Sequence, residues 1–146
     1  HVNVGVKMAE EICRRLRFSS NESEQITALV KNHMRFAHAG GMNPSTLKKF
    51  LRMPQFEQHL ELHRLDCLAS HGDLHSYNFV RAKLAEIPEP ALRPKPLVTG
   101  DDLIAAGYTP GPRFKEILAA VEDGQLDNRL QDPQQAMEFV RREFPR

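Results

Sequence analysis

Apolar residues recur at helical spacing through nearly the whole chain, and no segment alternates apolar and polar residues as a half-buried strand does. Residues 2–17 place four apolar side chains on one stripe, namely Val4, Met8, Ile12 and Leu16. Residues 55–71 and 73–87 carry two longer helical patterns, the first ending at Gly72. The pattern predicts an all-α fold, a helical array of about seven to eight helices.

Helix-start signals divide this array into segments. Two residue pairs have the spacing of a capping box: Ser19 with Glu22, and Thr99 with Asp102. A cap residue followed by proline at the first helical position occurs twice, at Asn43-Pro44 and at Asp132-Pro133. Pro112, after a tight turn from Gly107, predicts one more start.

Proline content changes abruptly after Ile87. The stretch to Val98 contains four prolines, at positions 88, 90, 94 and 96. Because an interior proline breaks a helix, we expect no helix here, but an extended, semi-rigid connector. The sequence therefore predicts a domain over residues 1–87, a connector over 88–98 and a helical segment over 99–146.

Composition sets limits on the function. No apolar run is long enough to span a bilayer, and no secretory pattern opens the chain. Cys13 and Cys67 lie far apart inside helical patterns, so we expect reduced thiols and a cytoplasmic protein. The net charge is +1; residues 1–87 carry 12 Lys and Arg against 9 Asp and Glu, and residues 88–146 carry 8 against 10. Any phosphate-binding surface is therefore a local patch.

Three stretches resemble the bacterial tRNA nucleotidyltransferase and poly(A) polymerase family, and they occur in the order of that family. Residues 10–34, EEICRRLRFSSNESEQITALVKNHM, are similar to the segment that follows the HD metal dyad. Residues 62–69, LHRLDCLA, are similar to the later aspartate-bearing helix of the HD-type domain. Residues 97–118, LVTGDDLIAAGYTPGPRFKEIL, resemble the C-terminal segment and are the most specific, because their glycines and prolines fall at family positions.

The resemblance implies a partial HD-like domain followed by a small C-terminal helical segment, within a longer polypeptide that adds CCA or A to RNA 3′ ends. It also implies Mg²⁺ with ATP or CTP in a catalytic head, and no cofactor in this segment. Gly40-Gly41 follows a helical pattern and lacks the strand and the Asp-x-Asp pair of such a head. Asp101 and Asp102 are adjacent, so on a helix they point about 100° apart and cannot face one ion. We therefore predict no catalytic residue in this chain.

By resemblance, His1, His33 and Asp66 match three positions of an HD-type metal site. The adjacent His-Asp dyad is expected upstream of His1, so this site is incomplete. His33 lies on an apolar helix face, which is typical of a core histidine, and Asp66 is expected to hold helices together. Two further pairs, His59 with His63 and His71 with His75, have the i, i+4 spacing of helix metal ligands but lack a carboxylate motif, so we interpret them as chance surface pairs.

RNA binding requires cationic side chains that face phosphates. The candidates form three groups: Lys48, Lys49 and Arg52 on a short helix, Arg93 and Lys95 on the connector, and Arg113 and Lys115 after Pro-Gly-Pro. The start of the helix that follows Pro-Gly-Pro favours anions through its free N–H groups, although the prolines supply none. The alternative for Pro-Gly-Pro is a plain tight turn, and for the basic groups an ordinary solvated face.

The leading hypothesis is a tRNA-binding region of a nucleotidyltransferase, with RNA and the catalytic head of the same polypeptide as partners. The first alternative is part of an HD-type metal-dependent phosphohydrolase. The second is a structural or oligomerising helical module, and the sequence leaves the oligomeric state open. His1 in place of Met, with no cap before the first helix, led us to expect that residues are missing upstream, although a tag remnant would also explain His1 itself.

Overall fold

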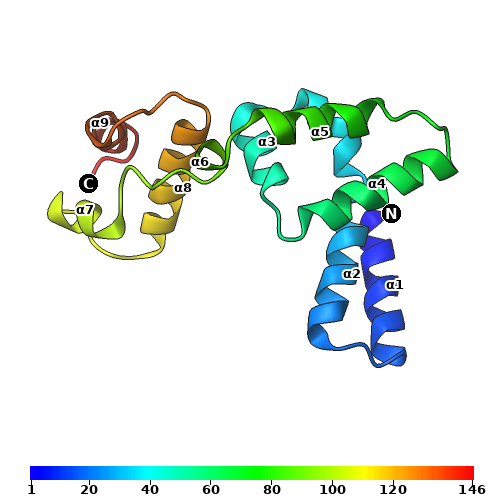
Figure 1. Cartoon of the computed structure of the whole chain (residues 1–146). Helices are drawn as coiled ribbons and strands as arrows, with labels where there is room; N and C mark the ends of the chain where they lie inside the picture. Colours follow the sequence, from blue (N-terminus) through cyan, green and yellow to red (C-terminus); the bar gives the residue numbers. More distant parts are fainter. The chain divides into compact units, whose positions relative to one another are not determined.

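The computed structural model describes all residues from His1 to Arg146 and contains only helices (Figure 1). The helices are α1 (Val2–Arg15), α2 (Ser20–Asn32), the 3₁₀ helix η1 (Arg35–Gly41), α3 (Pro44–Leu51), α4 (Phe56–Ala69), α5 (His75–Glu86), α6 (Glu89–Leu92), α7 (Gly100–Ala105), α8 (Pro112–Leu126) and α9 (Pro133–Glu143). The predicted all-α class is therefore confirmed. None of the helices combines the length and apolar composition needed to cross a bilayer.

The predicted helix-start signals form caps in the structure. Ser19 and Thr99 each complete a capping box, with Glu22 and Asp102 respectively. The Asn43 side chain accepts a hydrogen bond from Thr46 N at 2.9 Å, and Asp132 does the same from Gln135 N at 2.8 Å. These local bonds satisfy N–H groups that a helix start otherwise leaves unpaired.

The prediction that residues 87–98 contain no helix is wrong at Glu89–Leu92, where α6 forms one turn. Pro88 is its N-cap and Pro90 lies in its first turn. Proline is compatible with these positions because the first N–H groups of a helix have no intrahelical partner. The remaining prolines, Pro94 and Pro96, lie outside any helix.

The chain forms two compact units, and each unit consists of two separate stretches of the sequence. The first unit consists of His1–Gly41 and Met53–Glu86, and the second of Met42–Arg52 and Ile87–Arg146. The boundary between Glu86 and Ile87 lies where the proline-rich stretch begins. The helix α3 differs from the predicted division, because it belongs to the second unit although both of its sequence neighbours belong to the first.

In the first unit, α1 and α2 form a hairpin, while η1 packs against α5 and α4 contacts α2 and α5. The chain of α1 comes close to α2 at Gly5, where an added Cβ would lie 3.4 Å from Val30 Cγ1. The core centres on Phe36, whose ring stacks on Phe56 at 5.8 Å and on His63 at 4.6 Å between centroids.

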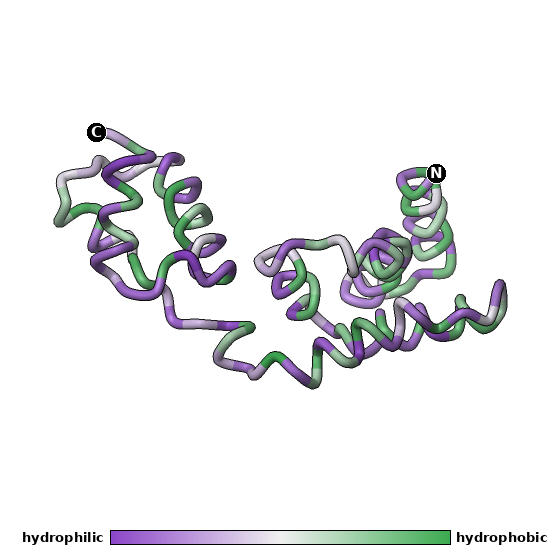
Figure 2. The backbone as a smooth tube through the Cα atoms, turned by 90° about the horizontal axis from the view of Figure 1, so that it is seen from above, coloured by the Kyte–Doolittle hydropathy of each residue, from purple (hydrophilic) through white to green (hydrophobic).

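In the second unit, the core lies between α7, α8 and α9. It consists of Val98, Leu103, Tyr108, Ile117, Val121, Leu130, Ala136 and Val140. Gly107, with φ +87°, ends α7 and lets Tyr108 N donate to Leu103 O at 3.0 Å. The Tyr108 hydroxyl then donates to Phe144 O at 2.9 Å, which holds the end of α9 against this turn. Figure 2 shows hydrophobic and hydrophilic residues interleaved along the helices, as amphipathic packing requires.

Candidate nucleic-acid interface

The basic helix α3 packs against α8 within the second unit. Lys48 is buried, with 8% of its surface exposed, and its Nζ donates to the carbonyl oxygen of Leu126 at 2.7 Å. Leu126 is the last residue of α8, so the lysine pairs a carbonyl that has no partner within the helix. The negative end of the α8 dipole also favours a cation there. Lys48 therefore holds α3 and α8 together.

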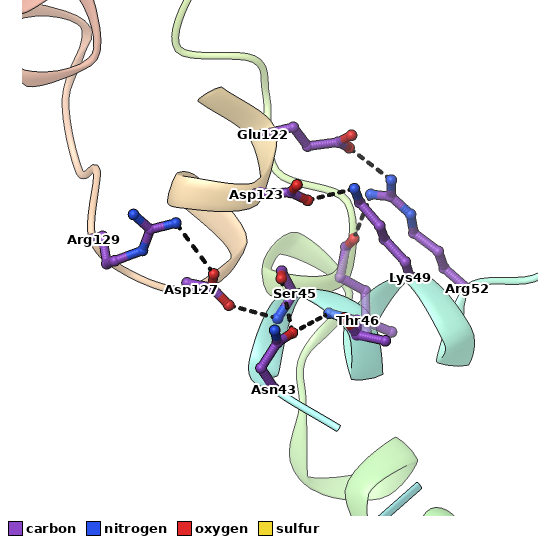
Figure 3. Close-up of polar contacts among 10 residues, drawn as sticks. Asn43, Ser45, Thr46, Lys49, Arg52, Glu122, Asp123, Asp127 and Arg129 are labelled. Atoms are coloured by element: carbon purple, nitrogen blue, oxygen red, sulfur yellow. Dashed lines mark hydrogen bonds and ion pairs between the residues drawn. The ribbon is translucent and has the colours of Figure 1, made fainter. Parts of the chain in front are cut away.

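The two other cations of this cluster form ion pairs with acidic residues of α8 (Figure 3). Lys49 Nζ pairs with Asp123, and Arg52 Nη2 lies 2.6 Å from Glu122 Oε1. Arg52 Nη1 also donates to Leu92 O at 3.2 Å, which links α3 to α6. The positive charges of Lys49 and Arg52, which were candidates for RNA phosphates, are thus already paired with carboxylates of the same unit.

A backbone contact completes the junction between α3 and α8. Ser45 N donates to Asp127 Oδ1 at 2.7 Å, as Figure 3 shows, and the second carboxylate oxygen lies 3.4 Å from Arg129 Nη2. Asp127 thereby satisfies an N–H group in the first turn of α3, next to the bond that Asn43 makes with Thr46. Contacts at four positions, Ser45, Lys48, Lys49 and Arg52, thus fix α3, and their partners could not be inferred from the basic residues alone.

The connector cations Arg93 and Lys95 have different environments. Arg93, the C-cap residue of α6, pairs with Glu89 in the first turn of that helix, and its Nη2 donates to Arg52 O at 3.3 Å. Lys95 contributes its backbone carbonyl to a 2.7 Å hydrogen bond from Gln125 Nε2, while its exposed ammonium forms no ion pair. Lys95 therefore keeps a cation free on the surface, whereas the charge of Arg93 is shared with a carboxylate.

Arg113 and Lys115 lie in the first turn of α8, are both exposed, and form no ion pair. Arg113 Nη2 donates to Pro145 O at 2.8 Å, a neutral carbonyl that leaves the positive charge of the guanidinium uncompensated. Pro112 has no N–H, and Phe114 N donates to Gly111 O at 3.0 Å, so this helix start offers few free N–H groups. Gly111 is the extended N-cap residue of α8 and Pro112 its first helical residue, so Pro-Gly-Pro leads directly into the helix, and the side chains supply the positive charge.

Arg113 also lines a small depression of about 190 Å³ together with Gly107, Tyr108, Thr109, Phe114, Ile117 and Arg146. A larger apolar hollow of about 390 Å³ lies between the connector and α8 and is lined by Pro94, Pro96 and Val121 among others. The first hollow contains two guanidinium groups, while the ionisable side chain of the second is Glu122, which already pairs with Arg52.

The three residues matched to an HD-type metal site are not gathered into one. His1 is the exposed N-cap of α1, the ring of His33 contacts Val30 O at the end of α2, and Asp66 is exposed on α4. No group of three or more His, Cys, Asp or Glu side chains in the structure is arranged to hold a metal ion. The Asp102 carboxylate, in turn, accepts bonds from Thr99 N and Oγ1, both at 2.7 Å, which identifies it as a helix cap. The side chains present therefore do not fit a resident Mg²⁺.

His59 and His63 are buried on the inner face of α4, so their interpretation as a surface pair is wrong. Burial lowers the pKa of His59, and the positive charge of Arg35 lowers it further. Burial also lowers the pKa of His63, an effect that the carboxylate of Asp66 partly opposes. His59 Nδ1 is buried without a hydrogen-bond partner, and both rings are therefore expected to be neutral at pH 7.

The two cysteines are free and buried, as predicted. Cys67 Sγ lies 3.6 Å from His63 Nε2, one turn away on α4. Burial raises the pKa of the Cys67 thiol, and the carboxylates of Asp66 and Asp73 raise it further. A protonated, buried thiol is a weak nucleophile, so this Cys–His contact is a packing contact.

These features define an all-helical segment with internally paired acidic and basic residues and a few cations that form no ion pair. A family model described as tRNA nucleotidyltransferase domain 2, putative, matches residues 1–140. The chain therefore belongs to the tRNA nucleotidyltransferase family. The predicted family resemblance is confirmed, whereas its HD-type detail stays a prediction.

Two curated relatives are similar to this chain. The A-adding tRNA nucleotidyltransferase of Deinococcus radiodurans is 30% identical over 152 residues, which cover 97% of this chain and 34% of that protein. The A-adding tRNA nucleotidyltransferase of Halalkalibacterium halodurans is 42% identical over 50 residues, which cover 34% of this chain and 12% of that protein. The chain thus spans about a third of the length of the first relative. No solved structure matches significantly.

Proposed function

We propose that this chain is a tRNA-binding region of a nucleotidyltransferase that adds nucleotides, A among them, to tRNA 3′ ends. The family match and the printed activity of both relatives support the tRNA partner. The observation that carries the binding role is the pair of exposed cations at the start of α8, Arg113 and Lys115, which no carboxylate neutralises. Such cations can exchange counterions for RNA phosphates without first breaking an internal ion pair.

In this proposal the chemistry belongs to another part of a longer polypeptide. Nucleotidyl transfer needs a divalent cation held by carboxylates, together with ATP or CTP, and the side chains described above do not form such a set. Lys95, which also lacks an ion pair, would extend the phosphate contacts beyond Arg113 and Lys115. Lys48, Lys49, Arg52 and Arg93 would contribute less, because carbonyl or carboxylate groups of the second unit already engage them.

A salt-titrated tRNA-binding assay tests this proposal. Replacing Arg113 and Lys115 together by Gln should weaken tRNA binding and reduce the slope of log affinity against log salt by about one per lost phosphate contact. The matched control is Lys7→Gln with Lys31→Gln, which removes the same charge from two exposed lysines of the first unit. Equal losses in both double variants, or equal affinity for tRNA and heparin, would show that only nonspecific charge attraction is present.

A further inference from the structure

Exposed apolar side chains are distributed very unevenly between the two units. Nine of the large hydrophobic residues that stay exposed belong to the first unit, namely Val4, Met8, Ile12, Leu16, Phe18, Met34, Leu62, Leu65 and Leu68. The second unit, of similar length, exposes one such residue, Ile104. A soluble domain rarely leaves a contiguous apolar surface uncovered unless another surface packs against it. The first unit therefore leaves far more of its large apolar side chains exposed than the second.

The α1 face is the most regular of these surfaces. Val4, Met8, Ile12 and Leu16 recur every four residues, so they lie along one side of the helix. Their exposed fractions are 61, 58, 43 and 61%. We call these four residues the α1 stripe. The helix comes close to α2 at Gly5, and the four stripe residues stay exposed although α1 and α2 pack together, so the hairpin partner of α1 does not cover the α1 stripe.

The end of the α1 stripe is strongly basic. Arg14, Arg15 and Arg17 follow one another there, are exposed, and form no ion pair. A surface that covers the stripe must therefore offer apolar side chains at helical spacing and carboxylates near the last turn of α1. A phosphate-rich RNA backbone would meet the arginines but not the four apolar side chains.

A second copy of this chain is poorly suited to cover the α1 stripe. Burying one Leu, Ile, Val or Met side chain fully removes on the order of 100 Å² of apolar surface from water, so four half-exposed side chains offer roughly 200–300 Å². A stable interface between separate molecules buries about 800 Å² on each partner. A segment of the same polypeptide needs far less area, because covalent linkage raises its effective concentration.

We propose that the α1 stripe is the docking site for an amphipathic helix from another part of the same polypeptide, with acidic residues opposite Arg14, Arg15 and Arg17. The D. radiodurans relative is long enough to contain such a segment, since this chain covers only 34% of the length of that protein. The inference concerns assembly of the protein and does not rest on the proposed RNA-binding role. If the α1 stripe binds such a helix, the first unit is part of a larger helical domain, whereas the second unit is a domain closed by its own residues.

Amide hydrogen exchange of α1 tests the proposal. In the longer native polypeptide that carries these residues, the α1 amides should exchange at least about tenfold more slowly than in the 146-residue chain. Replacing Met8 and Leu16 together by Gln should remove this added protection in the longer polypeptide and leave exchange in the 146-residue chain unchanged. Ile104→Gln is the matched control, because it changes an exposed apolar residue of the second unit.

Three results would overturn the proposal. The first is equal α1 exchange in the two unmodified proteins, a comparison that requires no variant to fold. The second is a 146-residue chain that sediments as a dimer and that Met8→Gln with Leu16→Gln dissociates, which would make a second copy the occupant. The third is a natural reading frame that encodes no residues beyond these 146.

Discussion

The ammonium of Lys48 donates a hydrogen bond to the carbonyl oxygen of Leu126 across 78 residues of sequence, in a buried position. A side chain that looks like a surface cation in the sequence thus closes the end of α8. Its neighbours Lys49 and Arg52 act in the same junction through Asp123 and Glu122. The basic face of α3 is therefore first of all an internal contact surface.

Lys48→Met should lower the free energy of unfolding by about 1–3 kcal/mol, because it leaves a buried carbonyl unpaired while nearly preserving side-chain volume. Urea unfolding followed by circular dichroism would measure this. Lys115→Met, at an exposed position of α8, is the control and should change stability by less than about 0.5 kcal/mol. Equal effects of the two substitutions would contradict a structural role for Lys48.

Lys49→Gln with Arg52→Gln should weaken tRNA binding less than Arg113→Gln with Lys115→Gln. The first pair already compensates carboxylates of α8, so RNA must compete with Asp123 and Glu122 for it. Both double variants remove two positive charges, so a filter-binding or fluorescence titration at one salt concentration compares them directly. A larger loss from the α3 pair would instead place RNA on α3.

Two helical glycines, Gly124 and Gly5, should respond differently to alanine. At Gly124, an added Cβ would lie 2.7 Å from Leu130 Cδ1 and 2.9 Å from Leu130 Cγ, so Gly124→Ala should cost about 1 kcal/mol or more despite its gain in helix propensity. At Gly5, the nearest atom would be Val30 Cγ1 at 3.4 Å, so Gly5→Ala should be neutral or stabilising by up to about 1 kcal/mol. Thermal melts of the two variants measure the difference, and equal shifts would argue against the close packing of α8 on Leu130.

The first unit should lose stability as the pH falls below about 6.5. The pKa values of His59 and His63 are lowered in the folded protein, chiefly by burial. As the pH falls, the unfolded chain therefore binds protons at a higher pH than the folded chain does, and this binding favours unfolding. Above about pH 6.5 the two rings are mostly neutral in both states, so the effect disappears. Unfolding free energies measured from about pH 7.5 to about pH 5.5 would show the slope.

His63→Phe should flatten part of this pH dependence, because phenylalanine keeps a ring against Phe36 and cannot be protonated. His75→Gln, at the exposed start of α5, is the control and should leave the slope unchanged. A slope that persists in full in His63→Phe would assign the pH dependence to other groups.

Local signals predicted most of the helices, since a cap depends on residues three or four positions apart. Asn43 and Asp132 start helices as expected, because the cap side chain and the backbone N–H that donates to it lie on the same turn. The turn of helix at Glu89–Leu92 was not predicted, because proline breaks the interior of a helix but is compatible with its start, and composition alone does not distinguish the two positions.

The candidate interface was less predictable, since it depends on tertiary contacts. Whether a lysine is free depends on what lies opposite, and the partners of Lys49 and Arg52 follow them by 70 residues or more. The same holds for α1: its apolar spacing is a correct helix signal, yet spacing alone does not say whether the stripe is covered. His59 and His63, by contrast, share helical spacing with Phe56, Leu60 and Cys67, so the sequence does contain a local signal for their burial.

The assignment of α3 to the second unit has a consequence for synthesis on the ribosome. Residues 42–52 leave the exit tunnel well before Asp123 and Leu126, the residues that pair with Lys49 and Lys48. During this interval α3 has its cap but no partner helix, and its buried face, including Phe50 and Leu51, is open to solvent. The second unit can close only after nearly the whole chain has emerged, so a nascent chain that stalls before α8 exposes a ready binding surface for chaperones.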